Sequence, residues 1–103
     1  MRPIIIRPAA EADLVAACEW YNEKRLGFGD RFLDSATVAA RFVAEHPEAY
    51  QVLHRGVRRA PLRGFPYGLL YRVHADVIIV VGVFHARRDP KAWRHRLARE
   101  RDS

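Results

Sequence analysis

The spacing of apolar positions changes from a helical period in the first half of the chain to a strand period in the second half. A short apolar strand is expected at Ile4–Arg7. From Ala10 until Gly27 apolar residues recur every three or four positions, which predicts a helix. The same spacing predicts a second helix over Gly29–Glu45, which Pro47 stops. Because only a few residues join the two, we expect an antiparallel helical hairpin.

Three strands and a last helix are predicted in the second half. The strands are expected at Val57–Leu62, Tyr67–Val73 and Val77–His85, and the last is a continuous apolar run, typical of a central strand covered on both faces. Short turns between them favour antiparallel pairing. Asp89 before a proline is a helix-start signal, since Asp caps free backbone donors and Pro suits the first helical position. A final helix is therefore expected over Pro90–Arg99.

The predicted architecture is a single α+β domain over residues 1–103. An N-terminal strand leads into the helical hairpin, which packs on a small antiparallel sheet, and a short C-terminal helix completes the order β-α-α-β-β-β-α. The tail from Glu100 is expected to fray. A chain of 103 residues supports one modest core and leaves no room for a second lobe with a large cofactor cleft.

Composition excludes several classes of protein. Cys18 is the only cysteine, so no internal disulfide and no cysteine-rich metal site can form. Neither a metal-ligand spacing nor a glycine-rich phosphate loop is present, so no metal and no cofactor are expected. The first residues do not have the pattern of a signal peptide, and the longest apolar run, Val77–Phe84, is too short to span a bilayer. We expect a cytoplasmic protein without a membrane partner.

The net charge of +6 hides an uneven distribution. Residues 1–50 contain five Arg and one Lys against eight acids, whereas residues 51–103 contain eleven Arg and one Lys against four acids. The basic character therefore belongs to the half that forms the sheet. Such a surface suits an acidic partner, either a nucleic acid or an acidic protein segment, and a solvated basic face is the plainer alternative.

Candidate chemistry gathers where the innermost predicted strand ends. His85 closes that strand, Arg87, Arg88 and Asp89 follow it, and Trp93 lies on the final helix. Histidine titrates near neutral pH and arginine suits phosphates and carboxylates, so this edge could carry anion-binding chemistry. Structural roles remain open for each: a hydrogen bond that orders the strand end, a helix cap, and a ring packed on the sheet.

The order of motifs along nearly the whole chain resembles the RelE/ParE toxin superfamily, and is closer to ParE. No single motif is decisive, but the combination of FPY, a YR pair, an apolar strand and HxxRDPxxW is specific. The residues that carry the resemblance are Asp13-Leu14, Trp20-Tyr21, Gly27-Phe28-Gly29, Phe32, Val57-Arg58-Arg59, Phe65-Pro66-Tyr67, Tyr71-Arg72, His85 to Pro90, Trp93 and Arg96. The resemblance implies the toxin of a type II toxin–antitoxin (plasmid stabilization) module, neutralised by a cognate ParD-like or RelB-like antitoxin.

The resemblance implies one of two activities. Members similar to ParE poison DNA gyrase by stabilising its cleaved DNA complex, whereas members similar to RelE enter the ribosome and cut mRNA. Cleavage of RNA needs a base, an acid and a cation at one phosphate. Cations are abundant here, but groups that could transfer a proton are few. His85 is the best of them, with His54 or His74 as a second.

We therefore expect a gyrase-directed toxin that is not an enzyme. The alternative is a ribosome-dependent endoribonuclease, and a third hypothesis is a module that has lost toxicity and only binds its antitoxin. The candidate catalytic residues of a ribonuclease would be His85, Arg88, Arg59 and Arg72.

A partner-binding surface is expected whatever the target. A hairpin covers one face of a small sheet well and leaves the other partly open, where apolar area and arginines would accept an acidic amphipathic segment of an antitoxin. Tyr67 and Tyr71 alternate onto one sheet face, where partner contact and core packing are both open. The residues predicted to bind partners are Arg58, Arg59, Tyr67, Tyr71, Arg72, Arg87, Arg88, Trp93 and Arg96.

Overall fold

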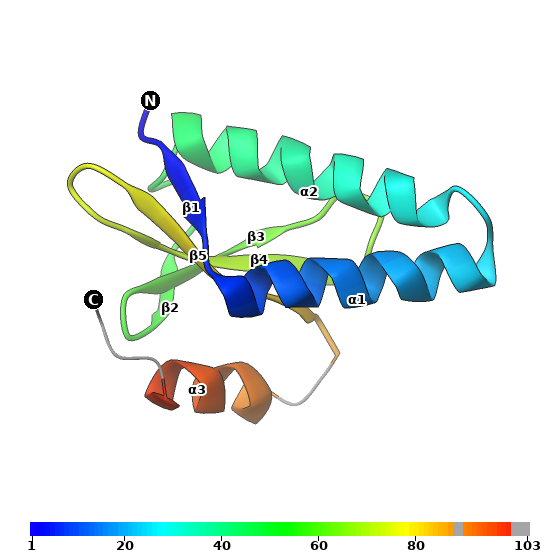
Figure 1. Cartoon of the computed structure of the whole chain (residues 1–103). Helices are drawn as coiled ribbons and strands as arrows, with labels where there is room; N and C mark the ends of the chain where they lie inside the picture. The colour runs from blue at the N-terminus through cyan, green and yellow to red at the C-terminus, as the bar shows by residue number, and fades with distance from the viewer. Residues whose placement is uncertain (88–89, 100–103) are drawn as a thin grey trace.

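The computed structural model describes residues 1–87 and 90–99, and its elements follow the predicted order with one additional strand (Figure 1). They are β1 (Ile4–Ile6), α1 (Pro8–Lys24), α2 (Phe28–Glu45), β2 (Val52–His54), β3 (Val57–Pro61), β4 (Tyr67–Val73), β5 (Ile78–His85) and α3 (Pro90–Arg99). The predicted α+β class is confirmed. The tail that was expected to fray, from Glu100, lies outside the described residues.

The five strands form one mixed sheet in the order β1-β5-β4-β3-β2. Strands β2 to β5 pair antiparallel with their neighbours, as short turns require, but β1 runs parallel to β5, with Ile4 opposite Ile78. The expectation of an antiparallel sheet therefore fails at this one edge. The hairpin and three further strands separate β1 from β5 along the chain, so no local turn sets the direction in which they pair.

Strand β2 was missed because it is short and exposed. It spans only Val52–His54, and a two-residue turn of Arg55 and Gly56 joins it to β3. Both turn residues have positive φ, 50° and 76°. Two positive φ values in a row are typical of tight hairpins, but the sequence signal usually carries Asn or Asp at the first of these positions. Arginine there concealed the turn.

Contacts between α1 and the start of α2 fix the helical hairpin. The side-chain oxygen of Asn22 accepts hydrogen bonds from the backbone N–H groups of Gly27 (3.2 Å) and Gly29 (2.8 Å), which satisfies donors at the first turn of α2. A Cβ atom at Gly29 would collide with the carbonyl oxygen of Cys18, so only glycine allows this approach. Helix α1 starts two residues before the expected Ala10, because a proline suits a first helical position.

Helices cover both faces of the sheet (Figure 1). The hairpin packs on the face that contains Leu69, Tyr71 and Val80, which we call the hairpin face, and α3 packs on the face that contains Leu70 and Val81, which we call the α3 face. The face that was expected to be partly open is thus partly covered by α3.

A bulge in β5 lets this strand serve both cores. Val81 is an extra residue on β5, because the pairing with β4 shifts by one position there. As a result Val80 and Val83 both belong to the hairpin-face core, whereas Val81 and Phe84 belong to the α3-face core. This arrangement explains why the run is continuously apolar instead of alternating.

The hairpin-face core is the larger of the two and is built around aromatic rings. Phe32 is fully buried, and its ring centroid lies 5.5 Å from that of Tyr21, 5.3 Å from Phe65 and 5.1 Å from Tyr67. The α3-face core consists of a few aliphatic side chains, with Leu97 of α3 seated on Val57, Leu70 and Val81. Burial of large rings on one face and of small aliphatic groups on the other makes the hairpin the stronger source of stability.

Candidate functional site

His85 lies at the end of β5 on the hairpin face. Its ring packs edge-on against Tyr67, with 5.2 Å between ring centroids, and its Nδ1 accepts a hydrogen bond of 3.0 Å from the backbone N–H of Arg87. With Asp13 and Trp20, His85 lines a cavity of about 530 Å³ between α1 and β5. The geometry fits the structural role, in which His85 orders the strand end.

Two arginines expected to act with His85 lie on the opposite face of the sheet. Arg59 of β3 and Arg72 of β4 alternate onto the α3 face. The Arg59 side chain lies across Gly68, where any Cβ atom would collide with it. The Nε of Arg72 donates to the carbonyl oxygen of Arg55 at 3.2 Å. The sheet thus separates the candidate base from these two candidate cations.

Arg58 faces the hairpin side and holds the segment that follows α2. Its Nη1 donates to the carbonyl oxygen of Tyr50 at 2.5 Å. The hydroxyl of Tyr71, its neighbour on β4, donates to the carbonyl oxygen of Pro47 at 3.0 Å. Burial raises the pKa of Tyr71, and the Arg58 guanidinium opposes this in part. Both side chains therefore anchor the chain between α2 and β2.

The two sheet tyrosines lie in the core. Tyr71 is fully buried and Tyr67 is 8% exposed, and both belong to the hairpin-face core. Burial raises the pKa of the neighbouring Tyr21, and Tyr67 adds to this rise. Of the two interpretations that the sequence left open, partner contact and core packing, these positions fit core packing.

An ion pair joins α1 to α3 across the edge of β5. Arg96 donates to both carboxylate oxygens of Asp13, from Nη1 at 2.5 Å and from Nη2 at 3.0 Å, and its guanidinium lies 4.6 Å from the ring centre of Phe84. The same carboxylate accepts a hydrogen bond of 2.9 Å from the backbone N–H of Val83, where β5 extends beyond its pairing with β1. Arg96, expected to contact a partner, thus also fastens α3. The two residues are 83 positions apart, so no local pattern revealed the pair.

Trp93 packs against the α3-face core and is half-buried. The ring centroid of His54, from β2, lies 6.0 Å from that of Trp93 in an edge-on arrangement, and the guanidinium of Arg94 lies 5.4 Å from the centre of the Trp93 ring. Of the other expected contact residues, Arg87 is exposed, whereas Arg88 and its neighbour Asp89 lie outside the described residues.

An apolar groove of about 590 Å³ runs between β1 and α2. Alanines on α2 leave space there, and β1 is an edge strand, so one side of its backbone meets no other strand. Ile6 and Leu33 are 41% and 37% exposed, and Arg2 and Arg41 also line the groove. Its apolar lining consists of Met1, Pro3, Ile4, Ile6, Leu14, Leu33, Ala36, Ala40, Ala44, Leu69 and Val80.

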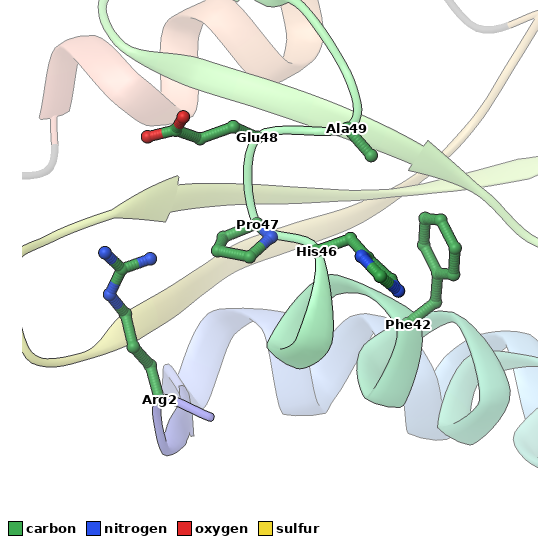
Figure 2. A pocket seen from close by; sticks show the side chains of 6 residues that line it. All are labelled: Arg2, Phe42, His46, Pro47, Glu48 and Ala49. Carbon is green, nitrogen blue, oxygen red and sulfur yellow. The ribbon is translucent and has the colours of Figure 1, made fainter.

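A second hollow, of about 570 Å³, adjoins the last turn of α2 (Figure 2). The rings of Phe42 and His46 stand side by side there, with 4.9 Å between centroids, while the Glu48 side chain points away from them. Arg2 lines this hollow and also the groove, and its Nε donates to the carbonyl oxygen of Ala75 at 3.1 Å. The two hollows are therefore neighbouring parts of one surface.

The described part of the chain offers neither a cluster of metal ligands nor a membrane-spanning helix. Within residues 1–87 and 90–99 no three His, Cys, Asp or Glu side chains are placed to hold a metal ion together. Over the same residues no helix has the length and apolar character needed to cross a bilayer.

Comparison with known proteins relates these features to a family. A profile of the family described as the ParE toxin of the type II toxin-antitoxin system parDE matches residues 4–90. A search of curated proteins finds no significant match.

Two solved structures have a similar fold. One is the chromosomal ParDE system from P. aeruginosa, with a TM-score of 0.64 and 18% identity over 84% of this chain and 98% of that chain. The other is the toxin–antitoxin complex RelBE2 from Mycobacterium tuberculosis, with a TM-score of 0.59 and 23% identity over 82% of this chain and 96% of that chain.

Proposed function

The chain belongs to the ParE toxin family of type II toxin–antitoxin systems, and from this premise we propose that it inhibits DNA gyrase in the cytoplasm and is neutralised by a cognate antitoxin. The observation that favours gyrase over mRNA is the position of His85 on the hairpin face, whereas Arg59 and Arg72 lie on the α3 face. RNA cleavage requires proton-transfer groups and a cation around one phosphate. A toxin that traps another enzyme requires no such set.

The groove between β1 and α2 suits the antitoxin. It offers apolar depth for the apolar side of an amphipathic segment, and Arg2 and Arg41 offer charged contacts to acidic residues. The open edge of β1 could also pair with an added strand. We expect a ParD-like partner whose binding segment is acidic and amphipathic.

A DNA-cleavage assay with purified gyrase tests the proposal. Toxin released from its antitoxin is added to gyrase, supercoiled plasmid and ATP, and the fraction of plasmid trapped as cleaved DNA is measured. We expect trapped DNA that disappears when antitoxin is added back, and an unchanged effect for His85→Gln. Gyrase that stays unaffected, together with cleavage of mRNA on translating ribosomes, would overturn the proposal.

One observation supports the alternative, a ribosome-dependent endoribonuclease. His54 contacts Trp93 and so lies on the α3 side, with Arg59 and Arg72. A ribonuclease on this chain would therefore depend on His54 instead of His85. If His54→Gln removes mRNA cleavage and His85→Gln does not, the alternative holds.

A further inference from the structure

Charge is divided between the two layers of this fold. Helices α1 and α2 contain seven Asp or Glu against three Lys or Arg. The five strands and α3 contain seven Lys or Arg and no acidic residue. This separation of charge gives the α3 side of the sheet a positive potential that attracts polyanions.

Two of the seven cations are directed toward the hairpin. Arg58 is turned to the hairpin side and binds the Tyr50 carbonyl oxygen, and Arg96 is paired with Asp13. The other five belong to the α3 side, where those on the strands are half-exposed and those on the helix are exposed. These five cations of the α3 face are Arg59, Arg72, Lys91, Arg94 and Arg99.

The Trp93 and His54 rings on this side pack against other side chains of the fold. Trp93 packs on the α3-face core, the His54 ring meets it edge-on at 6.0 Å, and Arg94 lies over it at 5.4 Å. A single strand is usually held by bases that stack on exposed rings. Contacts to a duplex backbone need cations but no stacking surface.

We propose that the five cations of the α3 face bind the phosphate backbone of duplex DNA. The inference rests on the proposed function, because gyrase acts on duplex DNA and a toxin bound there would touch the DNA as well as the enzyme. The contact adds affinity for the enzyme–DNA complex over the enzyme alone, and it carries no sequence preference.

An acidic protein segment fits this face less well. Protein partners draw most of their affinity from apolar or aromatic anchors in pockets. The apolar groove of this chain has Leu69 and Val80 in its lining, and both belong to the hairpin face. The protein partner and the duplex thus bind on opposite sides of the sheet.

Fluorescence polarisation with a labelled 20-base-pair duplex tests the inference on the full chain released from antitoxin. The double variant Lys91→Gln/Arg94→Gln removes two cations of the α3 face. Its matched control, Lys24→Gln/Arg31→Gln, removes one Lys and one Arg from exposed positions on the hairpin. A third variant, Arg59→Gln/Arg72→Gln, removes the sheet cations, so the test does not depend on α3 staying docked.

Both α3-face variants should weaken duplex binding by about 10-fold or more at 0.1 M salt and lower the slope of log affinity against log salt by about 2, whereas the control should change affinity by less than about 2-fold. Equal loss in the control, tighter binding to a single-stranded RNA of the same length, or no binding to the duplex at 50 mM salt would each overturn the inference.

Parallel gyrase assays keep this inference apart from the proposed function. Trapped cleavage that persists in variants with weakened duplex binding would overturn the DNA contact as part of the toxin's action and leave gyrase as the target. Intact duplex binding with unaffected gyrase would remove the proposed target instead and leave the DNA contact supported.

Discussion

The hairpin side and the α3 side of this sheet differ in both packing and charge. The hairpin side has the larger core, with Phe32 and its aromatic neighbours, and its helices are acidic on balance. The α3 side has a small aliphatic core and no acidic residue in its strands or helix. The hairpin side thus supplies most of the stability, whereas the α3 side presents positive charge.

The two sides also differ in how firmly they are held. Helix α3 is attached through Leu97, Trp93 and the Asp13–Arg96 pair, whereas the hairpin packs on residues of β1, β3, β4 and β5. Segments with little buried apolar area open at lower free energy than the main core. We therefore expect α3 to detach before the rest of the fold unfolds.

The largest effect should come from the hairpin core. Phe32→Ala should lower the free energy of unfolding by about 3–5 kcal/mol, because it removes a fully buried ring from an aromatic cluster. Phe42→Ala, on the same helix but 41% exposed, should cost about 1 kcal/mol or less. Urea denaturation followed by far-UV circular dichroism measures both, and equal costs would contradict the packing described.

The second-largest effect should come from the Asp13–Arg96 ion pair, which attaches α3 to α1. Asp13→Ala should lower the free energy of unfolding by about 2–4 kcal/mol, because it leaves the Arg96 guanidinium and the Val83 N–H without their acceptor in a largely buried place. Glu11→Ala, an exposed acid on the same turn of α1, should stay within about 0.5 kcal/mol. A double-mutant cycle with Arg96→Ala should give a coupling above about 1 kcal/mol. A coupling near zero would mean that the pair does not hold the layers together.

The next effect, on binding, concerns the groove between β1 and α2, where we propose that the antitoxin binds. Ile6→Arg should weaken antitoxin binding by about 10-fold or more, about 1.4 kcal/mol, because it places a charge in an apolar groove. Val15→Arg is the control, since Val15 is similarly exposed but lies outside the groove lining. Isothermal titration calorimetry measures both. If the two variants lose affinity equally, the antitoxin binds elsewhere.

The smallest effect concerns Tyr71. Tyr71→Phe should cost about 1 kcal/mol at neutral pH through the lost hydrogen bond to Pro47. Burial raises the pKa of Tyr71, so its hydroxyl ionises more readily in the unfolded chain than in the folded protein. The free energy of unfolding is therefore unaffected by this group below the ordinary tyrosine pKa of 10.0, and it falls as the pH rises above that value. Denaturation series from pH 8 to 11 should show a shallower alkaline loss in the variant. An identical loss in both proteins would assign it to other groups.

Most of the fold could be predicted from the sequence because short-range patterns determine most of its helices and strands. Helical spacing gave the hairpin, and Asp-Pro gave the start of α3 at Pro90. The missed features depend on distant or atypical contacts: Arg55 conceals the turn before β3, and β1 pairs parallel to a strand more than 70 residues away. Such pairings have no local signature.

The candidate site was predicted less well, for a geometric reason. A sequence shows that His85 and several arginines lie near strand ends, but the face that each occupies depends on register and on the bulge at Val81. The same limit hid the Asp13–Arg96 pair, whose members lie at opposite ends of the chain.

The most direct test of the account is the gyrase cleavage assay run with His85→Gln and Arg59→Gln/Arg72→Gln side by side. We expect His85→Gln to trap as much cleaved plasmid as the unmodified toxin, and the double variant to trap about 10-fold less at equal concentration because two phosphate contacts are lost. Loss of trapping in His85→Gln, with the double variant unaffected, would contradict the assignment of function to the α3 face.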